Sequence, residues 1–235
     1  MRILITRPQP AAEKTAARLR AMGHEPLVLP LTQGISEPDA AQAALRQEGY
    51  TALALTSAQA VQTLSLLAGE LAPYLDIPVY CVGAATANAA GLLGFRKVIT
   101  GPGTGEGLGE RIARELTADQ KPRILYLAGA PRAPDFEAGL HRGTIHFRTV
   151  EIYRMVPLNN AEPRLKSILA ETAPDAVLFY SSETAHRFFN LPSASHLADL
   201  RYLCLSPVIA RILPSTIRNV AVAATPDEDS LLRLL

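Results

Sequence analysis

The sequence predicts an α/β protein built from doubly wound, flavodoxin-like or Rossmann-like parallel sheets. Short runs rich in Val, Ile and Leu recur along the 235 residues, and most are apolar at nearly every position. Strands that are buried on both faces have this pattern, as in parallel sheets covered by helices. Helical patterns separate the runs, which is typical of a doubly wound fold. An internal repeat indicates two such lobes.

The predicted strands are apolar, β-branched runs, each followed by a turn. They are expected at Arg2–Thr6, Pro26–Pro30, Ala52–Thr56, Val79–Val82, Lys97–Thr100, Arg123–Leu127, Ile145–Val150, Ala176–Tyr180, Tyr202–Leu205 and Val220–Ala224. The clearest helix has Ala12, Ala16, Leu19 and Met22 on one face and ends at Gly23. Helices are expected at Gln9–Met22, Ala58–Leu67, Ala84–Leu93, Glu106–Leu116, Asp135–Leu140, Glu162–Leu169, Glu183–Phe189, Pro207–Leu213 and Glu228–Leu235.

Three segments of the first half recur in the same order in the second half. RILITRPQP, ALALTSAQA and YCVGAATA, from Arg2, Ala52 and Tyr80, match RILYLAGAP, AVLFYSSET and LCLSPVIA, from Arg123, Ala176 and Leu203. The offsets are 121, 124 and 123 residues, which is too long for a solenoid repeat. The alternative is chance similarity among buried strands, but the turn residues after the strands match as well. The repeat therefore indicates a duplicated α/β unit.

Two divisions of the chain are compatible with this repeat. In the first, two sequential halves meet near Gln120. In the second, the first strand–helix–strand, residues 1 to 31, joins the C-terminal lobe, and the chain returns from a central lobe near Tyr153. The second division is slightly favoured, because residues 31–38 and 149–157 can run side by side as connecting strands and are punctuated by Pro and Gly.

Composition excludes several classes of protein. Hydrophobic residues make up 48% and charged residues 19%, and the net charge of +1 offers no basic face for nucleic acid. Cys81 and Cys204 form no CxxC or Cys/His cluster, so no metal site is expected, and buried, inert thiols are predicted. No apolar run reaches about 18 residues, and MRILITRP does not resemble a signal peptide. We expect a cytoplasmic protein with no membrane partner.

Six segments spread along nearly the whole chain carry a family likeness. They read LITRP, ALTSAQAV, VYCVGAATANAAGLLGF, VEIYR, LFYSSETAHRF and AATPDEDSLLRLL, in this order. Together they resemble uroporphyrinogen-III synthases, although no single motif is diagnostic. The resemblance implies a discontinuous lobe of residues 1–33 and 154–235, an inserted lobe of residues 36–150, and a two-stranded neck of residues 31–38 and 149–157. The substrate is then expected in the cleft between the lobes.

The resemblance also implies the reaction. The substrate is hydroxymethylbilane, a linear tetrapyrrole with eight carboxylates, and the enzyme is a lyase of haem biosynthesis. It removes water, inverts the last pyrrole and closes the ring without a cofactor or metal, and a monomer suffices. Such catalysis works chiefly by orientation, with modest proton transfer, so the absence of a Ser–His–Asp arrangement does not count against it.

Donors for the substrate carboxylates are expected where the parallel strands end. Helix N-termini at that edge present unpaired N–H groups and a partial positive charge. For Ser57, Thr86 and Ser182, capping of a helix is an equally good explanation. Arg7 and Arg132 can pair with carboxylates, or they are exposed arginines that flank helices. The candidate substrate-binding residues are Thr6, Arg7, Thr56, Ser57, Ala58, Gly83, Thr86, Gly129, Arg132, Ser181, Ser182, Ser206, Pro207 and Val208.

Tyr153 is the catalytic candidate, because it matches the family's tyrosine in the crossing segment. A phenol there can protonate or hydrogen-bond the departing hydroxyl; the alternative is an aromatic side chain that packs the neck. One turn departs from the family, since Ser206–Ala210 lacks the threonine that the central lobe keeps as Thr86. If that hydroxyl binds substrate in relatives, backbone N–H groups or another donor must replace it here.

Two other functions remain open from the sequence. The fold supports a non-catalytic, two-lobed binding protein for a small anionic ligand equally well. A nucleotide-dependent transferase needs a phosphate loop or a carboxylate–metal site. The glycine-rich segment Gly101–Glu110 lacks the GK[ST] ending of a phosphate loop, and a flexible loop leading into a helix is predicted there.

Overall fold

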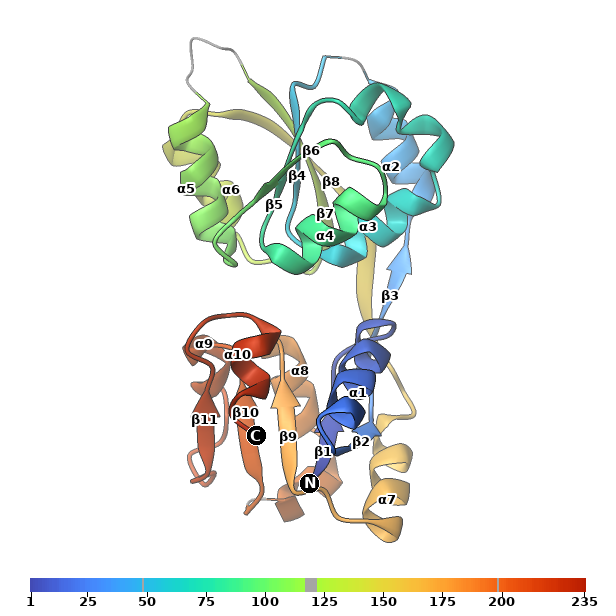
Figure 1. The fold of residues 1–235 in the computed structure, drawn as a ribbon, viewed down its shortest axis with the longest axis vertical. Helices are drawn as coiled ribbons and strands as arrows, with labels where there is room; N and C mark the ends of the chain where they lie inside the picture. The colour runs from blue at the N-terminus through green and yellow to red at the C-terminus, as the bar shows by residue number, and fades with distance from the viewer. Residues whose placement is uncertain (48, 117–121, 198) are drawn as a thin grey trace. The chain divides into compact units, whose positions relative to one another are not determined.

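The computed structural model describes residues 1–47, 49–116, 122–197 and 199–235. These residues divide into two compact units, one of residues 1–33 and 156–235 and the other of residues 34–155 (Figure 1). Both are α/β with mainly parallel sheets, which confirms the predicted class. The boundary near Gln120 of the sequential division lies outside the described residues.

The first unit has a parallel sheet with helices on both faces. Among its described residues, five strands lie in the order β11-β10-β9-β1-β2. The strands are β1 (Arg2–Ile5), β2 (Glu25–Val28), β9 (Ala176–Phe179), β10 (Arg201–Cys204) and β11 (Val220–Val222). Helices α1 (Ala11–Ala21) and α10 (Glu228–Leu232) pack on one face. The other face carries α7 (Ala161–Glu171), α8 (Ser182–Phe189), α9 (Pro207–Ala210) and the 3-10 helix η4 (Pro192–Leu197).

The second unit repeats this plan with one more strand at the edge. In its described part, six strands lie in the order β3-β8-β7-β4-β5-β6. They are β3 (Thr32–Ser36), β4 (Ala52–Leu55), β5 (Pro78–Cys81), β6 (Lys97–Thr100), β7 (Arg123–Ala130) and β8 (His146–Pro157). Helices α5 (Gly105–Glu115) and α6 (Asp135–Arg142) cover one face. The other face carries α2 (Pro38–Leu45), α3 (Ala58–Ser65), α4 (Ala84–Leu92), η1 (Ala68–Glu70) and η2 (Ala72–Tyr74).

The matched sequence segments occupy equivalent places in the two sheets. β1 and β7 carry the first match, β9 and β4 the second, and β10 and β5 the third. The order β2-β1-β9-β10-β11 in the first sheet thus corresponds to β8-β7-β4-β5-β6 in the second. Numbered along the repeat, both are 2-1-3-4-5, which is the flavodoxin-like order. Cys81 and Cys204 both end their strands, and both are buried. Their predicted burial is confirmed, and burial raises the pKa of each thiol to about 12, which disfavours the reactive thiolate.

Several elements differ from the sequence prediction, most clearly in three places. Pro38 ends no connecting strand but lies in the first turn of α2, where its missing N–H costs nothing. The strand predicted at 145–150 and the connecting segment 149–157 form one continuous strand, β8. Helix α9 is a single turn that ends at Ala210, short of the predicted Leu213. Leu213 precedes Pro214, which disfavours helical backbone at that position.

The glycine-rich segment Gly101–Glu110 is a loop that leads into a helix, as the sequence predicts. Helix α5 begins at Gly105, and Thr104 caps it by accepting a hydrogen bond from the N–H of Gly107 at 3.2 Å. Gly109 lies inside the helix, where a Cβ would stand 3.0 Å from the Cα of Gly139 in α6. The glycines therefore bring two helices close together as well as forming a turn.

Gly109→Ala is expected to lower the free energy of unfolding by about 1–3 kcal/mol, because the added methyl has no room beside α6. Gly91→Ala in α4 is the matched control, since no described atom lies within 4 Å of a Cβ at that position. Alanine there is expected to stabilise the helix by up to about 1 kcal/mol. Urea unfolding followed by circular dichroism measures both variants. Equal stability of Gly109→Ala and the parent would contradict the close approach of α5 and α6.

A half-buried carboxylate links the ends of three elements in the first unit. Oε1 of Glu228, at the start of α10, accepts hydrogen bonds from Arg7 Nη1 at 2.9 Å, Thr15 Oγ1 at 2.6 Å and the Tyr180 hydroxyl at 2.7 Å. Its Oε2 accepts one from Arg18 Nη1 at 2.9 Å. The Arg7 guanidinium also lies 3.9 Å from the centroid of the Tyr180 ring. These bonds tie α10 to the residues that follow β1 and β9.

The Glu228 carboxylate contributes stability that depends on pH. Burial by itself raises the pKa of this carboxyl, but the hydrogen bonds from Thr15 and Tyr180 and the charge of Arg7 outweigh burial and leave the pKa lowered. A carboxyl with a lowered pKa in the folded state stabilises that state above its unfolded pKa. The stabilisation is lost as the pH falls through the folded pKa.

Glu228→Gln is expected to lower the free energy of unfolding at pH 7 by about 1–3 kcal/mol, because charge-assisted hydrogen bonds are lost. The difference from the parent should shrink as the pH falls below about 4. Asp229→Asn is the control: the Asp229 side chain is 69% exposed and pairs with Arg18, so its loss should cost about 0.5 kcal/mol or less. Chemical unfolding across this pH range measures both. An equal loss in the two variants would refute the special role of Glu228.

Candidate functional site

Tyr153 lies on β8, beside the end of β7 in the second unit. It is 7% exposed, and in the strand register it pairs with Gly129 of β7. Its ring lies so close over Gly129 that a Cβ on the glycine would overlap the ring and the hydroxyl oxygen. The phenol is therefore held at the carboxyl edge of the sheet, where ligands of such folds bind.

The environment of Tyr153 keeps its phenol protonated at neutral pH. Burial raises the pKa of the hydroxyl, and a hydrogen bond with the Ser57 side chain lowers it by less, so the pKa is raised overall. Ser57 follows β4 and also caps α3, accepting a hydrogen bond from the N–H of Gln59 at 3.1 Å. Tyr153 can therefore donate a hydrogen bond, and its partner here is a neutral hydroxyl.

A second tyrosine lies in the same part of the unit. The Tyr126 hydroxyl of β7 lies 2.8 Å from Oγ1 of Thr56. Burial raises the pKa of Tyr126, and the neighbouring Tyr153 adds to the shift. Tyr126 was not among the residues predicted from the sequence. It could have been found as the one residue with a hydroxyl in the strand β7. We call Thr56, Ser57, Tyr126, Gly129 and Tyr153 the Tyr153 cluster.

The charged candidate of this unit is already paired. Arg132 donates hydrogen bonds to the carboxylates of Glu151 and, at 3.3 Å, Glu137. Glu137 in turn accepts a hydrogen bond from Oγ1 of Thr149 at 2.6 Å. A substrate carboxylate would have to displace these carboxylates or share the guanidinium with them.

The remaining candidates of the second unit lie at the first turns of α3 and α4. Ala58 is the exposed first residue of α3, and Gly83 is the N-cap of α4. Thr86 is buried inside the first turn of α4 and does not cap it, so capping is the wrong explanation for this residue. Ala58 and Gly83 place little side-chain bulk over the N–H groups at these helix starts.

In the first unit, the candidate hydroxyls have different partners. Thr6 is buried and donates to the carbonyl of Leu178 at 2.9 Å. Ser181 caps α8 by accepting from the N–H of Thr184 at 3.2 Å, so the prediction that Ser182 caps this helix is wrong. Arg7 is paired with Glu228. Binding of substrate by these residues remains a prediction.

The turn that departs from the family's pattern leaves its hydroxyl free of a capping role. Ser206 is the N-cap residue of α9, but its side chain makes no capping hydrogen bond. Pro207 opens the helix, and Val208 is 60% exposed. Whether the Ser206 hydroxyl contacts the substrate remains a prediction.

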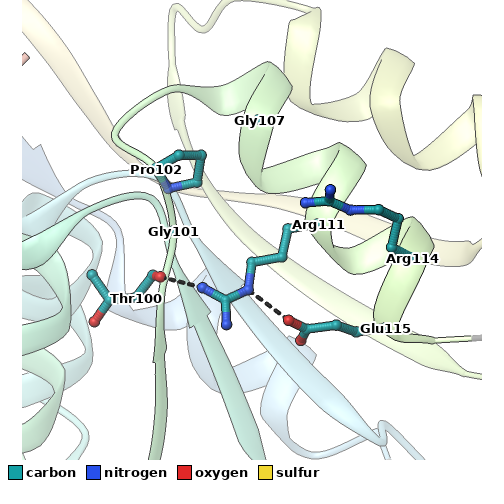
Figure 2. A pocket seen from close by; sticks show the side chains of 7 residues that line it. All are labelled: Thr100, Gly101, Pro102, Gly107, Arg111, Arg114 and Glu115. Atoms are coloured by element: carbon teal, nitrogen blue, oxygen red, sulfur yellow. Dashed lines mark hydrogen bonds and ion pairs between the residues drawn. The ribbon is translucent and has the colours of Figure 1, made fainter.

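A pocket of about 460 Å³ lies elsewhere in the second unit, between the end of β6 and α5 (Figure 2). Arg111 spans it, donating to the Thr100 carbonyl and, through Nε at 2.7 Å, to Glu115. Since β6 is an edge strand, Arg111 satisfies one of its unpaired carbonyls. Burial and the charge of Glu115 raise the pKa of Tyr80 to about 12. The described pocket lining includes none of the candidate substrate-binding residues: Thr100, Gly101, Pro102, Gly107, Arg111, Arg114 and Glu115.

The described residues also bear on other classes of site. They contain no group of three or more His, Cys, Asp or Glu side chains placed to hold a metal ion. Nor do they contain a helix with the length and hydropathy needed to span a membrane.

Comparison with solved structures finds the same fold in two uroporphyrinogen-III synthases. The enzyme from Helicobacter pylori is 19% identical, with a TM-score of 0.66 over 100% of this chain and 98% of that chain. A mutant of the enzyme from Thermus thermophilus is also 19% identical, with a TM-score of 0.58 over 99% of this chain and 96% of that one. Comparison with curated protein sequences finds no match.

The family comparison covers most of both units. The family model described as uroporphyrinogen-III synthase HemD matches residues 13–233, a span that includes Tyr153 and most of the candidate turns. The chain belongs to the uroporphyrinogen-III synthase HemD family.

Proposed function

We infer that this chain is a uroporphyrinogen-III synthase, which cyclises hydroxymethylbilane with loss of water and inversion of the last pyrrole. The match of the family model over residues 13–233 is the observation that carries this conclusion. It favours a cofactor-independent lyase of tetrapyrrole biosynthesis over a non-catalytic binding protein. The substrate is accordingly a linear tetrapyrrole with eight carboxylates.

The chemistry demands control of geometry more than acceleration. The hydroxymethyl group leaves an electron-rich pyrrole readily as water once it is protonated, and the resulting azafulvene cation is strongly electrophilic. Without an enzyme the bilane can close to the uninverted type I isomer. The protein must therefore hold the two ends so that attack occurs at the substituted carbon of the last ring, which is catalysis chiefly by orientation.

Tyr153 is the proposed proton donor to the departing hydroxyl. The support is its position at the carboxyl edge of the sheet, its raised pKa and its neutral partner Ser57. A phenol with a raised pKa is a weak acid, so its contribution is a hydrogen bond that strengthens as the C–O bond breaks. The ease of water loss makes such modest assistance sufficient.

Neutral donors are the proposed main contacts of the substrate carboxylates. The first turns of α3, α4 and α8 offer unpaired N–H groups, and Ser206 offers a hydroxyl. Arg7 and Arg132 are weaker candidates, because Glu228 and the Glu137–Glu151 pair already neutralise them. Candidate donors are proposed in each unit, and the enzyme is proposed to be a monomer of the cytoplasm.

Incubation of the protein with hydroxymethylbilane, followed by oxidation and chromatography, is expected to yield mainly the type III isomer. The reason is that only an enzyme-held bilane undergoes inversion of the last ring. A reaction without protein gives the background of type I. Predominantly type I product at saturating protein would disprove synthase activity and leave the anion-binding alternative.

Tyr153→Phe is expected to fold normally and to lower kcat about 100-fold, because it removes one weak proton donor. KM should change little, since the ring remains. Tyr50→Phe is the matched control: it makes the same chemical change at a tyrosine outside the Tyr153 cluster, and its kcat should equal that of the parent. Steady-state kinetics and circular dichroism measure both. An unchanged kcat and isomer ratio in Tyr153→Phe would remove this residue from the mechanism.

A further inference from the structure

The α-carbon of Gly129 is not open to a ligand on the side where a side chain would project. The space that a Cβ would occupy is filled by the ring and hydroxyl of Tyr153. The sequence predicts Gly129 in a short turn after a strand, where a small residue lets the backbone approach the substrate, but Gly129 lies within β7. In the folded chain, Tyr153 makes that close approach instead.

A β-bulge in β8 accounts for the direction of the Tyr153 side chain. Ala128 pairs with Glu151 and Gly129 pairs with Tyr153, so Ile152 is an extra residue opposite the shift in register. In a regular strand, neighbouring side chains point to opposite faces. Here Ile152 and Tyr153 are consecutive, and both pack into the same hydrophobic cluster.

The side chains on either side of the bulge confirm that the alternation of side chains between the two faces of the sheet shifts by one residue. Before it, Val150 and Ile152 pack in this cluster; after it, Tyr153 and Met155 do so. Without the extra residue, Tyr153 would face the opposite side of the sheet, away from Ser57 and Gly129. The bulge therefore brings the phenol to this face, and only glycine at position 129 leaves room for it.

We propose that Gly129 and the bulge at Ile152 form a seat that positions the Tyr153 phenol and thereby supports formation of the type III isomer. This inference rests on the proposed function, because the phenol is the group being positioned. Gly129 is a positioning residue: it acts through Tyr153, and its backbone does not itself contact the substrate on that face. Any side chain at position 129 displaces the ring from Ser57.

The experiment compares Gly129→Ala, Tyr153→Ala, the double variant and the control Gly91→Ala, whose added methyl meets no described atom within 4 Å. Steady-state kinetics with substrate in excess give kcat and KM. A separate reaction at saturating enzyme gives the fraction of type III product. Thermal unfolding gives the melting temperature of each variant. The melting temperatures test whether the Tyr153 ring packs on Gly129, whatever reaction the protein catalyses. The fraction of type III product tests whether this packing matters for catalysis.

If the Tyr153 ring packs on Gly129, the effect of Gly129→Ala on stability depends on whether the ring is present. Gly129→Ala should lower the melting temperature by roughly 2–12 °C in the parent, because the methyl overlaps the ring. It should have little effect in the Tyr153→Ala background, where the ring is gone. Gly129→Ala should also lower kcat about 100-fold and reduce the type III fraction, with KM changed less than threefold. Gly91→Ala should match the parent in kcat and isomer fraction.

Two results would overturn the proposal. The first is an equal loss of melting temperature from Gly129→Ala with and without the Tyr153 ring, which would show that the methyl clashes with something else. The second is a folded Gly129→Ala protein with the parent's kcat and type III fraction, which would show that the seat is irrelevant to the reaction. If the parent itself forms only type I product, the proposed function fails, while the stability coupling still tests the seat.

Discussion

The packing of the Tyr153 ring against the bare α-carbon of Gly129 is the contact on which the candidate site depends. It needs three features of the chain at once: a glycine at the end of β7, an extra residue in β8, and a serine at the start of α3 that shares a hydrogen bond with the Tyr153 hydroxyl. β-bulges re-aim side chains next to active sites, which is their effect here. Because β7 lies inside the sheet and β8 beside it, the sheet itself fixes the phenol in place.

The distribution of charge at the two sheet edges suits a ligand that must be turned as well as held. The arginines nearest the candidate turns are neutralised by carboxylates of the chain, Arg7 by Glu228 and Arg132 by Glu137 and Glu151. Fixed ion pairs between guanidinium groups and eight substrate carboxylates would resist movement of the last pyrrole. N–H groups at helix starts bind carboxylates more weakly and over a range of positions. Neutral donors therefore fit a reaction controlled by orientation.

Much of the fold follows from the sequence because its signals are local. Buried strands give continuous apolar runs, and the duplicated segments occupy equivalent strands. The fold class and the internal repeat can therefore both be predicted from the sequence. The site is less predictable because it depends on register. Tyr153 was found through family likeness, but nothing in the order of residues reveals that Ile152 has no register partner on β7. Nor does it reveal that Glu228 pairs with Arg7, 221 positions earlier. Helix α2 was missed because proline signals either a strand end or a helix start, and only packing decides.

Duplication allowed the two sheet edges to diverge in chemistry. Thr56 and Tyr180 hold the same place in the repeat. Thr56 follows β4 and Tyr180 follows β9, which are equivalent strands of the two sheets. In the first unit, the Tyr180 hydroxyl donates to the Glu228 carboxylate, so its proton is already engaged by a stronger acceptor. In the second unit, the Tyr126 hydroxyl meets Thr56 and the Tyr153 hydroxyl meets Ser57, both neutral partners. A neutral hydroxyl holds a phenol less strongly than a carboxylate does, so the Tyr153 hydroxyl is freer than that of Tyr180 to bond another acceptor. These neutral partners support the proposal that the proton donor lies in the second unit, while the ion pairs of the first unit tie α10 to the residues near it.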